Sequence, residues 1–303
     1  MKRKIVKHGP ISLTVSLPSK WVKRYALKPG DEIEVVEEGA NLKVISGKDL
    51  TVGEFRVRLK ETTYSYLKSV ISNAYKKGYD RVFIEYENEN VLKGVQKAVD
   101  SLLGIEIVSK SKNECEIRNI SRELEAEFDS ILKNSVILLI EMSQQVFTDV
   151  KNNYTGNSEN IYYNKEVITK YTDFCKRILN KYRKNEEVMV FEYLIVWSLE
   201  KIANEYQYLY NYCIKSFPIK LSPQTLSFFR ETNELLELYS QALLEKNIKK
   251  IEILSRVKDR LLFKEYYQSL SRVKVKELPI MHHLANIVRR LWDSSGPLHG
   301  RLG

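Results

Sequence analysis

Residues 11–33 read ISLTVSLPSKWVKRYALKPGDEI, and this stretch decides the fold of the N-terminal part of the chain. From Ile11 to Leu17 apolar residues alternate with Ser and Thr, which is the period of a β-strand with one hydroxyl-bearing face. A turn signal, His-Gly-Pro at 8–10, precedes this strand, and Pro18 ends it. The pattern therefore predicts a hairpin whose second strand covers residues 11–17.

The residues after this strand predict a short helix and a second hairpin. Ser19 is expected to cap a helix over 20–27, and Lys-Pro-Gly at 28–30 turns the chain again. Two further strands are predicted at 33–35 and 42–45. Two strands, one short helix and two strands in under fifty residues leave little chain for an independent core, so a partner chain is expected.

Charge changes sign abruptly along this segment. The first thirty residues contain eight Lys or Arg and no acid, and the next eight contain five acids. A basic edge of this kind suits a surface that faces phosphates, because Lys and Arg displace condensed counterions there. The alternative interpretation is that these side chains are solvated and belong to a dimerisation module that never meets DNA.

Several short motifs give residues 1–48 a family likeness. They are Arg3-Lys4, Gly9 at the turn, Leu17-Pro18, the WVKRY run at 21–25 and the LKPGDEI run at 27–33. With these motifs the segment resembles the AbrB/MazE/SpoVT-type swapped-hairpin DNA-binding domain. The resemblance implies that two chains interleave their hairpins into one small β-barrel, and that basic side chains of its strands and loops face DNA.

The resemblance also implies a set of DNA-binding residues. By position these are Lys2, Arg3, Lys4, Lys7, Lys20, Lys23 and Arg24, with hydrogen bonds added by Ser12 and Thr14. Two departures from the family pattern stand out. Ala26 occupies a place where Gly is usual, which predicts a less sharp helix exit, and the basic doublet Lys23-Arg24 is displaced by one residue.

Residues 51–119 predict a small α/β module. A long helix is expected over 51–77, a strand over 81–86, a second helix over 91–103, and a hairpin built from 105–108 and 114–118. This segment contains no Gly-rich phosphate loop, nucleophile elbow or paired acids. A connector or dimer-contact role is the interpretation that these residues favour.

From residue 121 onward the pattern predicts only helices. Ser121 is expected to cap the first of six, and the others are predicted at 160–184, 187–215, 223–246, 248–270 and 277–295, the last ending at Gly296-Pro297. The six predicted helices fall into two repeats, 121–216 and 222–297. The second repeat begins after a break in the helical pattern, with Ser222 as the predicted cap and Pro223 at the first helical position. Such tandem three-helix bundles resemble PhoU, the regulator of phosphate uptake.

The PhoU likeness implies a degenerate metal motif. The family carries Glu-x-x-x-Asp on the third helix of each repeat, where both carboxylates share one helix face. Here Glu200 is followed by Asn204, and Asp293 is preceded by Arg289. The implied ligands are Glu200, Asn204 and Asp293 for a divalent, iron or zinc ion; the alternative is ordinary surface ion pairs. His282 and His283 are adjacent and His299 follows them, and a solvated or capping role is favoured for all three.

The composition of the whole chain limits which classes of protein it can belong to. The 303 residues carry a formal net charge of +10, and Cys115, Cys175 and Cys213 show no paired spacing. A reducing cytoplasm is therefore expected, and no apolar run reaches membrane-spanning length. We predict a multidomain α+β protein: a dimeric N-terminal barrel, a small α/β module and a helical half.

A chain that combines this N-terminal segment with this helical half resembles archaeal PhoU-like proteins with an AbrB-type head. The two likenesses imply a DNA-binding transcriptional regulator of phosphate uptake, a homodimer whose helical half receives a signal from a phosphate transporter component, a signalling protein or an ion. The alternative is a dimeric adaptor of such a transporter that does not bind DNA. An antitoxin is less favoured, because antitoxin tails are usually short and disordered. No enzyme is predicted, since no nucleophile–base arrangement or nucleotide motif is found.

Overall fold

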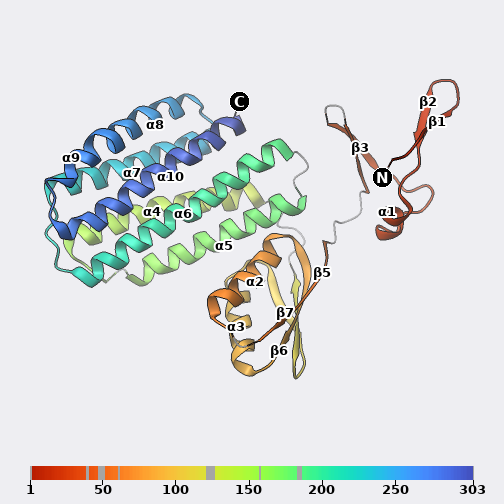
Figure 1. Ribbon diagram of the computed structural model, residues 1–303, viewed down its shortest axis with the longest axis horizontal. Helices are drawn as coiled ribbons and strands as arrows, with labels where there is room; N and C mark the ends of the chain where they lie inside the picture. Colours follow the sequence, from red (N-terminus) through yellow and green to blue (C-terminus); the bar gives the residue numbers. More distant parts are fainter. Residues whose placement is uncertain are drawn as a thin grey trace. The chain divides into compact units, whose positions relative to one another are not determined.

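The computed structural model describes residues 2–38, 41–46, 52–60, 62–120, 127–156, 158–182 and 186–302. The chain forms two compact units, Met1–Thr51 and Val52–Gly303 (Figure 1). Small sheets and a helical C-terminal region make it a multidomain α+β protein.

The first unit contains two antiparallel hairpins and one short helix. Strands β1 (Ile5–His8) and β2 (Ser12–Val15) form the first hairpin, helix α1 (Ser19–Arg24) follows, and strands β3 (Glu34–Glu38) and β4 (Asn41–Ile45) form the second. This order confirms the sequence-based prediction. The turn between β1 and β2 uses Gly9 at φ +81°, a conformation that glycine adopts without steric cost.

Both ends of α1 differ from the prediction. Pro18 is the N-cap residue, and its carbonyl accepts hydrogen bonds from Trp21 N and Val22 N, so the prediction that Ser19 caps the helix is wrong. At the other end Ala26 has φ +47°. Its N–H bonds Lys23 O, and Leu27 N bonds Val22 O, which together form a Schellman motif. The exit is therefore sharp, because Ala26 adopts the left-handed conformation usually taken by glycine.

The second unit begins with a four-stranded sheet and two helices. Its elements are β5 (Val52–Leu59), α2 (Tyr64–Lys76), β6 (Tyr79–Tyr86), α3 (Glu89–Asp100), β7 (Ile105–Lys110) and β8 (Glu114–Asn119). The strand order is β5-β6-β8-β7, with β5 parallel to β6 and the other pairs antiparallel. We call this part, residues 52–120, the α/β module.

The predicted helix over 51–77 is wrong in its first half. Phe55, Val57 and Leu59 alternate with charged residues, which is a strand period, and β5 pairs along its length with β6. Only residues 64–76 are helical, capped by the Thr63 side chain, which accepts from Tyr66 N, and followed by Gly78 at φ +90°. The module is thus β-α-β-α-β-β, and α2 forms the crossover between two parallel strands.

The C-terminal region, residues 127–302, is a bundle of long helices. Its elements are α4 (Phe128–Asn152), α5 (Ser158–Tyr182), α6 (Glu186–Ser216), α7 (Pro223–Leu244), α8 (Lys249–Asp259), the π-helical η2 (Arg260–Tyr266), α9 (Tyr267–Leu270), the 3-10 turn η3 (Val275–Glu277) and α10 (Leu278–Leu302). Ser222 caps α7 by accepting from Thr225 N, as predicted. The predicted cap Ser121 lies outside the described residues.

Helix α10 continues through Gly296 and Pro297 to Leu302, so the predicted end at this dipeptide is wrong. Tertiary contacts hold the last turn: Leu298 is fully buried, and Arg301 forms an ion pair of 3.1 Å with the buried Glu192 of α6. These contacts offset the missing N–H of a proline inside a helix.

The bundle has one continuous core. Helix α6 packs along α10, α4 packs against α5, α6 and α7, and α7 packs against α8 and α10. Tyr206, Tyr210 and Tyr239 are fully buried in it, and the hydroxyl of Tyr206 donates to Asn233 Oδ1 at 2.8 Å. No helix in the described ranges combines the length and apolar character needed to cross a lipid bilayer. The α/β module contacts the bundle through α2 and α5.

Candidate nucleic-acid interface

The predicted DNA-binding residues of the first unit are exposed wherever their side chains are described. Lys2, Arg3 and Lys4 precede β1, and Lys7 lies on β1. Lys20 and Lys23 lie on α1, three residues apart and therefore on one side of that helix. The side chain of Arg24 lies outside the described part of the chain.

The register of the first hairpin divides the predicted residues between two faces. Lys7 lies opposite Leu13, and Ile5 lies opposite Val15, so these four residues share one face. Val6 lies opposite Thr14, and His8 lies opposite Ser12, which places both hydroxyl residues on the other face. The Thr14 hydroxyl donates to Val6 O at 3.2 Å. Lys7 therefore does not share a face with Ser12 and Thr14.

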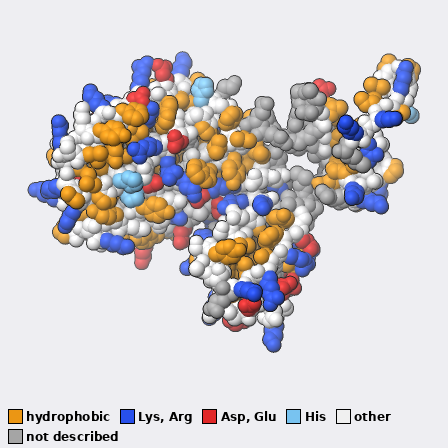
Figure 2. Space-filling view, in the orientation of Figure 1, with side chains coloured by type: hydrophobic (Ala, Val, Ile, Leu, Met, Phe, Trp, Pro, Cys, Tyr) orange, Lys and Arg blue, Asp and Glu red, His pale blue; other side chains and the backbone are white. Residues whose placement is uncertain are grey.

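The Lys7 face of this hairpin is otherwise apolar and uncovered. Ile5 and Leu13 are each 69% exposed, and Val15 is 52% exposed. Hydrophobic side chains are visible along the hairpin in Figure 2. The second hairpin also exposes Val35 and Leu42. We call the set Ile5, Leu13 and Val15 the hairpin apolar face.

Helix α1 places aromatic residues beside its basic ones. The rings of Trp21 and Tyr25, one helical turn apart, lie 5.4 Å from each other at an interplanar angle of 56°. Trp21 and Val22 are half-buried, whereas Lys20 and Lys23 are exposed. The helix therefore packs one side against its own unit and presents two cations on another.

The residues of the degenerate PhoU-like motif lie on α6 and α10. Glu200 forms ion pairs with Lys176 of α5, whose side chain is 2% exposed, and with Lys201. Burial alone would raise the pKa of Glu200, but these two cations outweigh it and hold the pKa below its usual range. Asn204 is half-buried, and Asp293 is exposed.

A metal centre does not emerge from these residues. Across the described ranges no group of three or more His, Cys, Asp or Glu could hold a metal ion. His283 Nδ1 lies 2.9 Å from Glu205 Oε2, so this histidine joins α10 to α6, and the solvated or capping role predicted for it is wrong. His282 Nε2 lies 3.1 Å from Asn286 Nδ2 on its own helix.

Residues 12–50 match the family model described as "Antidote-toxin recognition MazE, bacterial antitoxin". This range begins with β2 and contains α1, β3 and β4. The N-terminal unit carries a MazE-type domain. The match does not extend to the α/β module or the bundle. No curated protein and no solved structure gives a significant match to the chain.

Lys176 and Lys201 are partners of Glu200 that the sequence motif did not indicate, and Lys176 is the buried one. Lys176 stands 24 residues before Glu200, on a different helix, and no local pattern distinguishes it from a surface lysine. Its burial is set by the packing of α5 against α6.

Proposed function

We propose that the chain is a homodimeric DNA-binding regulator of transcription, in which the MazE-type domains of two protomers form one swapped-hairpin barrel. The observation that carries this proposal is the match of residues 12–50 to the MazE model, on a unit that holds eight Lys or Arg before its first acid. Domains of MazE/AbrB type commonly bind DNA and dimerise. The proposal includes no catalytic step.

The exposed apolar side chains support dimerisation. Strands β1 and β2 have four residues each, and an isolated two-stranded hairpin is marginally stable in water at best. The hairpin apolar face is more than half exposed in the single chain. Covering it with the hairpin of a second copy would remove apolar area from water, which stabilises by about 25 cal/mol per Å².

The basic side chains support DNA binding. Lys2, Arg3 and Lys4 lead into β1, and Lys20 and Lys23 project from α1. Lysine and arginine side chains at a duplex release condensed counterions, and this gives affinity without sequence specificity. Specificity would come from base contacts, for which Ser12 and Thr14 on the opposite hairpin face are candidates.

We further propose that the helical region receives the signal and that this signal concerns phosphate uptake. Two sets of helices, α4–α6 and α7–α10, pack so that their last members, α6 and α10, lie along each other. This arrangement supports the PhoU likeness, with a phosphate transporter component or a signalling protein as partner. The test is transcription from a phosphate-transport promoter at high and low phosphate, comparing the full chain with residues 1–120. Loss of the phosphate response with retention of DNA binding is expected.

DNA binding is tested by fluorescence anisotropy of the full chain with phosphate-transport promoter DNA and with random DNA, at two salt concentrations. The test variant changes Lys2, Arg3 and Lys4 together to Ala. The charge-matched control changes Lys249, Lys264 and Lys274, exposed lysines of the helical region, to Ala.

The expected result is salt-dependent binding that only the N-terminal variant weakens. The slope of log affinity against log salt should fall by about 0.9 for each phosphate contact removed. Absence of binding at low salt, or equal weakening by both variants, would contradict the DNA-binding proposal. The chain would then be better described as a dimeric adaptor that does not bind DNA.

An antitoxin is the second candidate, because the matching family model is described as a bacterial antitoxin. The chain would then neutralise a toxic partner protein. Co-expression of the full chain with the product of the neighbouring gene tests this candidate. If the neighbouring gene product stops growth and the full chain restores it, the antitoxin function is favoured. If the neighbouring gene product expressed alone does not slow growth, the result counts against an antitoxin.

A further inference from the structure

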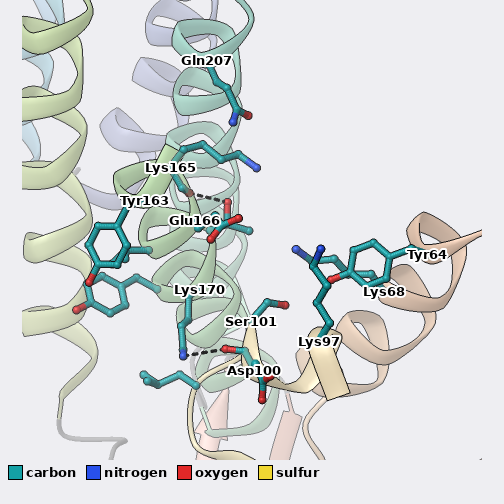
Figure 3. Close-up of a pocket in the computed structure, with 14 residues that line it drawn as sticks. Tyr64, Lys68, Lys97, Asp100, Ser101, Tyr163, Lys165, Glu166, Lys170 and Gln207 are labelled. Atoms are coloured by element: carbon teal, nitrogen blue, oxygen red, sulfur yellow. Dashed lines mark hydrogen bonds between the residues drawn. The ribbon is translucent and has the colours of Figure 1, made fainter. Parts of the chain in front are cut away.

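A cavity of about 550 Å³ lies within the second unit, where the α/β module meets the bundle. One wall comes from α2 and α3 and the other from α5, as Figure 3 shows. Tyr64, Lys68 and Lys97 line the module side, and Lys165, Glu166 and Lys170 line the bundle side. The amines of Lys68 and Lys97 point from one wall and that of Lys165 from the other (Figure 3).

The cavity has more cations than carboxylates. Four lysines line it against two acids, Asp100 and Glu166, both of which are exposed. Gln96 Nε2 already donates to Asp100 Oδ1 at 2.9 Å. Lys170 Nζ donates a hydrogen bond to the backbone O of Asp100 at 3.1 Å, so the partner of this ammonium group is a neutral carbonyl and not a carboxylate. Lys97 Nζ lies 4.9 Å from the centre of the Tyr64 ring.

Unlike the two lysines whose partners have just been described, Lys68 and Lys165 use their ammonium groups for neither a hydrogen bond nor a ring contact among the described residues. Both are half-buried, and neither forms an ion pair within the parts of the chain that the structure describes. Burial lowers the pKa of Lys165, and the positive charges of Lys68 and Lys201 lower it further, whereas the carboxylates of Glu200 and Glu166 raise it. Two half-buried like charges on opposite walls of one cavity disfavour each other unless an anion lies between them.

We propose that this cavity binds a phosphorylated small molecule of about nucleotide size, with its anionic groups held between Lys68 of α2 and Lys165 of α5. Phosphate groups suit the site because four lysines line it against two exposed carboxylates, one of which already accepts a hydrogen bond from Gln96. The volume falls in the range of small-molecule sites and far exceeds that of a single phosphate ion. Tyr64, Tyr163 and Leu103 supply apolar surface for the rest of the ligand.

The position of the cavity gives the ligand a structural effect. Its two walls belong to the α/β module and to the bundle, so a bound anion would draw α2 and α5 together and strengthen their contact. This inference does not depend on the proposed DNA binding, and its test uses no DNA.

The test is isothermal titration calorimetry of the full chain with ATP, pyrophosphate, inorganic phosphate and citrate at constant ionic strength. The variants are Lys68→Met and Lys165→Met, with Lys133→Met, an exposed residue of α4 outside the cavity, as matched control. The triple Ala variant of Lys2, Arg3 and Lys4 controls for anion binding at the N-terminal unit. Thermal unfolding of every variant without ligand accompanies the titrations.

We expect ATP and pyrophosphate to bind once per chain, more tightly than inorganic phosphate. Either cavity variant should weaken this binding at least tenfold, while Lys133→Met and the N-terminal triple variant should bind as the wild type does. Without ligand, Lys165→Met should have a melting temperature no lower than that of the wild type, because it removes one of two positive charges that face each other across the cavity. A variant that loses binding while remaining folded thus supports the site.

Three results would overturn the proposal. One is the absence of saturable binding for all three phosphate compounds, and another is binding of citrate alone. The third is binding that Lys165→Met leaves unchanged but the N-terminal triple variant abolishes, which would place the anion on the basic N-terminal unit.

Discussion

Arg177 of α5 and Asp80 of β6 join the bundle to the α/β module through a hydrogen bond of 2.6 Å from Nη2 to Oδ1. The other terminal nitrogen of the Arg177 guanidinium, Nη1, donates to the backbone carbonyls of Tyr75 and Tyr79, at 2.8 Å and 2.9 Å. Lys181 Nζ bonds both oxygens of Asp80. One guanidinium thus satisfies the carbonyl at the end of α2, the carbonyl at the start of β6 and a carboxylate, which holds the crossover of the module against α5.

Replacing Arg177 by Met should strongly destabilise this contact. The Arg177 side chain is 3% exposed, so its loss removes a buried donor from the carbonyls of Tyr75 and Tyr79 and leaves Lys181 as the cation that faces Asp80. Breaking a buried ion pair in this way costs about 3–5 kcal/mol. Urea unfolding should show this loss, together with faster hydrogen exchange in α2. The control Arg56→Met removes ion pairs of a side chain that is 60% exposed, and it should cost about 1 kcal/mol or less.

The buried carboxylate Glu277 gives a prediction for pH dependence. Its Oε2 accepts from Ser222 N at 2.9 Å, from the Ser222 hydroxyl at 2.7 Å and from the Thr225 hydroxyl at 2.5 Å. Burial raises the pKa of Glu277, but these donors outweigh burial and hold the pKa below its usual range. Glu277 therefore contributes stability above the unfolded-state pKa of about 4.3, and this contribution disappears as the pH falls through the folded-state pKa.

Glu277→Gln should consequently lower the free energy of unfolding at pH 7 by about 1.5–3 kcal/mol, the value of hydrogen bonds to a charged group. The difference from the wild type should narrow as the pH falls below about 4.3. Urea titrations at pH 7, 5 and 3.5 measure it. Glu252→Gln, at an exposed i,i+4 pair with Arg256, is the control and should change stability by about 0.5 kcal/mol or less. A difference that does not vary with pH would contradict the role assigned to the Glu277 charge.

Ala26→Gly should stabilise the N-terminal unit by about 1 kcal/mol, because Ala26 adopts φ +47°, where glycine is not strained. The gain is measured as slower hydrogen exchange of the α1 amides. Gly30→Ala is the reverse change at a second left-handed position, φ +94°, and it should destabilise the same unit. Faster exchange in Ala26→Gly would show that the backbone at this position is not strained.

Leu13→Asp should abolish the proposed dimer, because it places a charge in the middle of the hairpin apolar face. Light scattering after size exclusion should then give the mass of one chain, 35.5 kDa, where the wild type gives twice that mass. Val275→Asp is the control, since Val275 is an 80% exposed apolar residue of the second unit. A wild type that is already monomeric, or a control that dissociates as well, would contradict dimerisation through the hairpins.

The sequence by itself determined the elements whose signals are local. The alternation from Ile11, the turn at Gly9 and the Ser222–Pro223 start of α7 each lie within a few residues, and the structure confirms them. Such signals arise from backbone sterics, caps and side-chain period, which do not depend on distant contacts. The motifs around Trp21 were likewise sufficient to indicate the MazE-type domain that the family comparison supports.

Only the tertiary structure decided features that join residues far apart in the chain. Arg177 and Asp80 are separated by 97 residues, and Lys176 and Glu200 belong to different helices. Helix α10 passes Pro297 because α6 holds its end. Lys68 and Lys165 face one cavity only because α2 docks on α5. In each case the deciding energy is a contact across the core, and no local period or propensity encodes it.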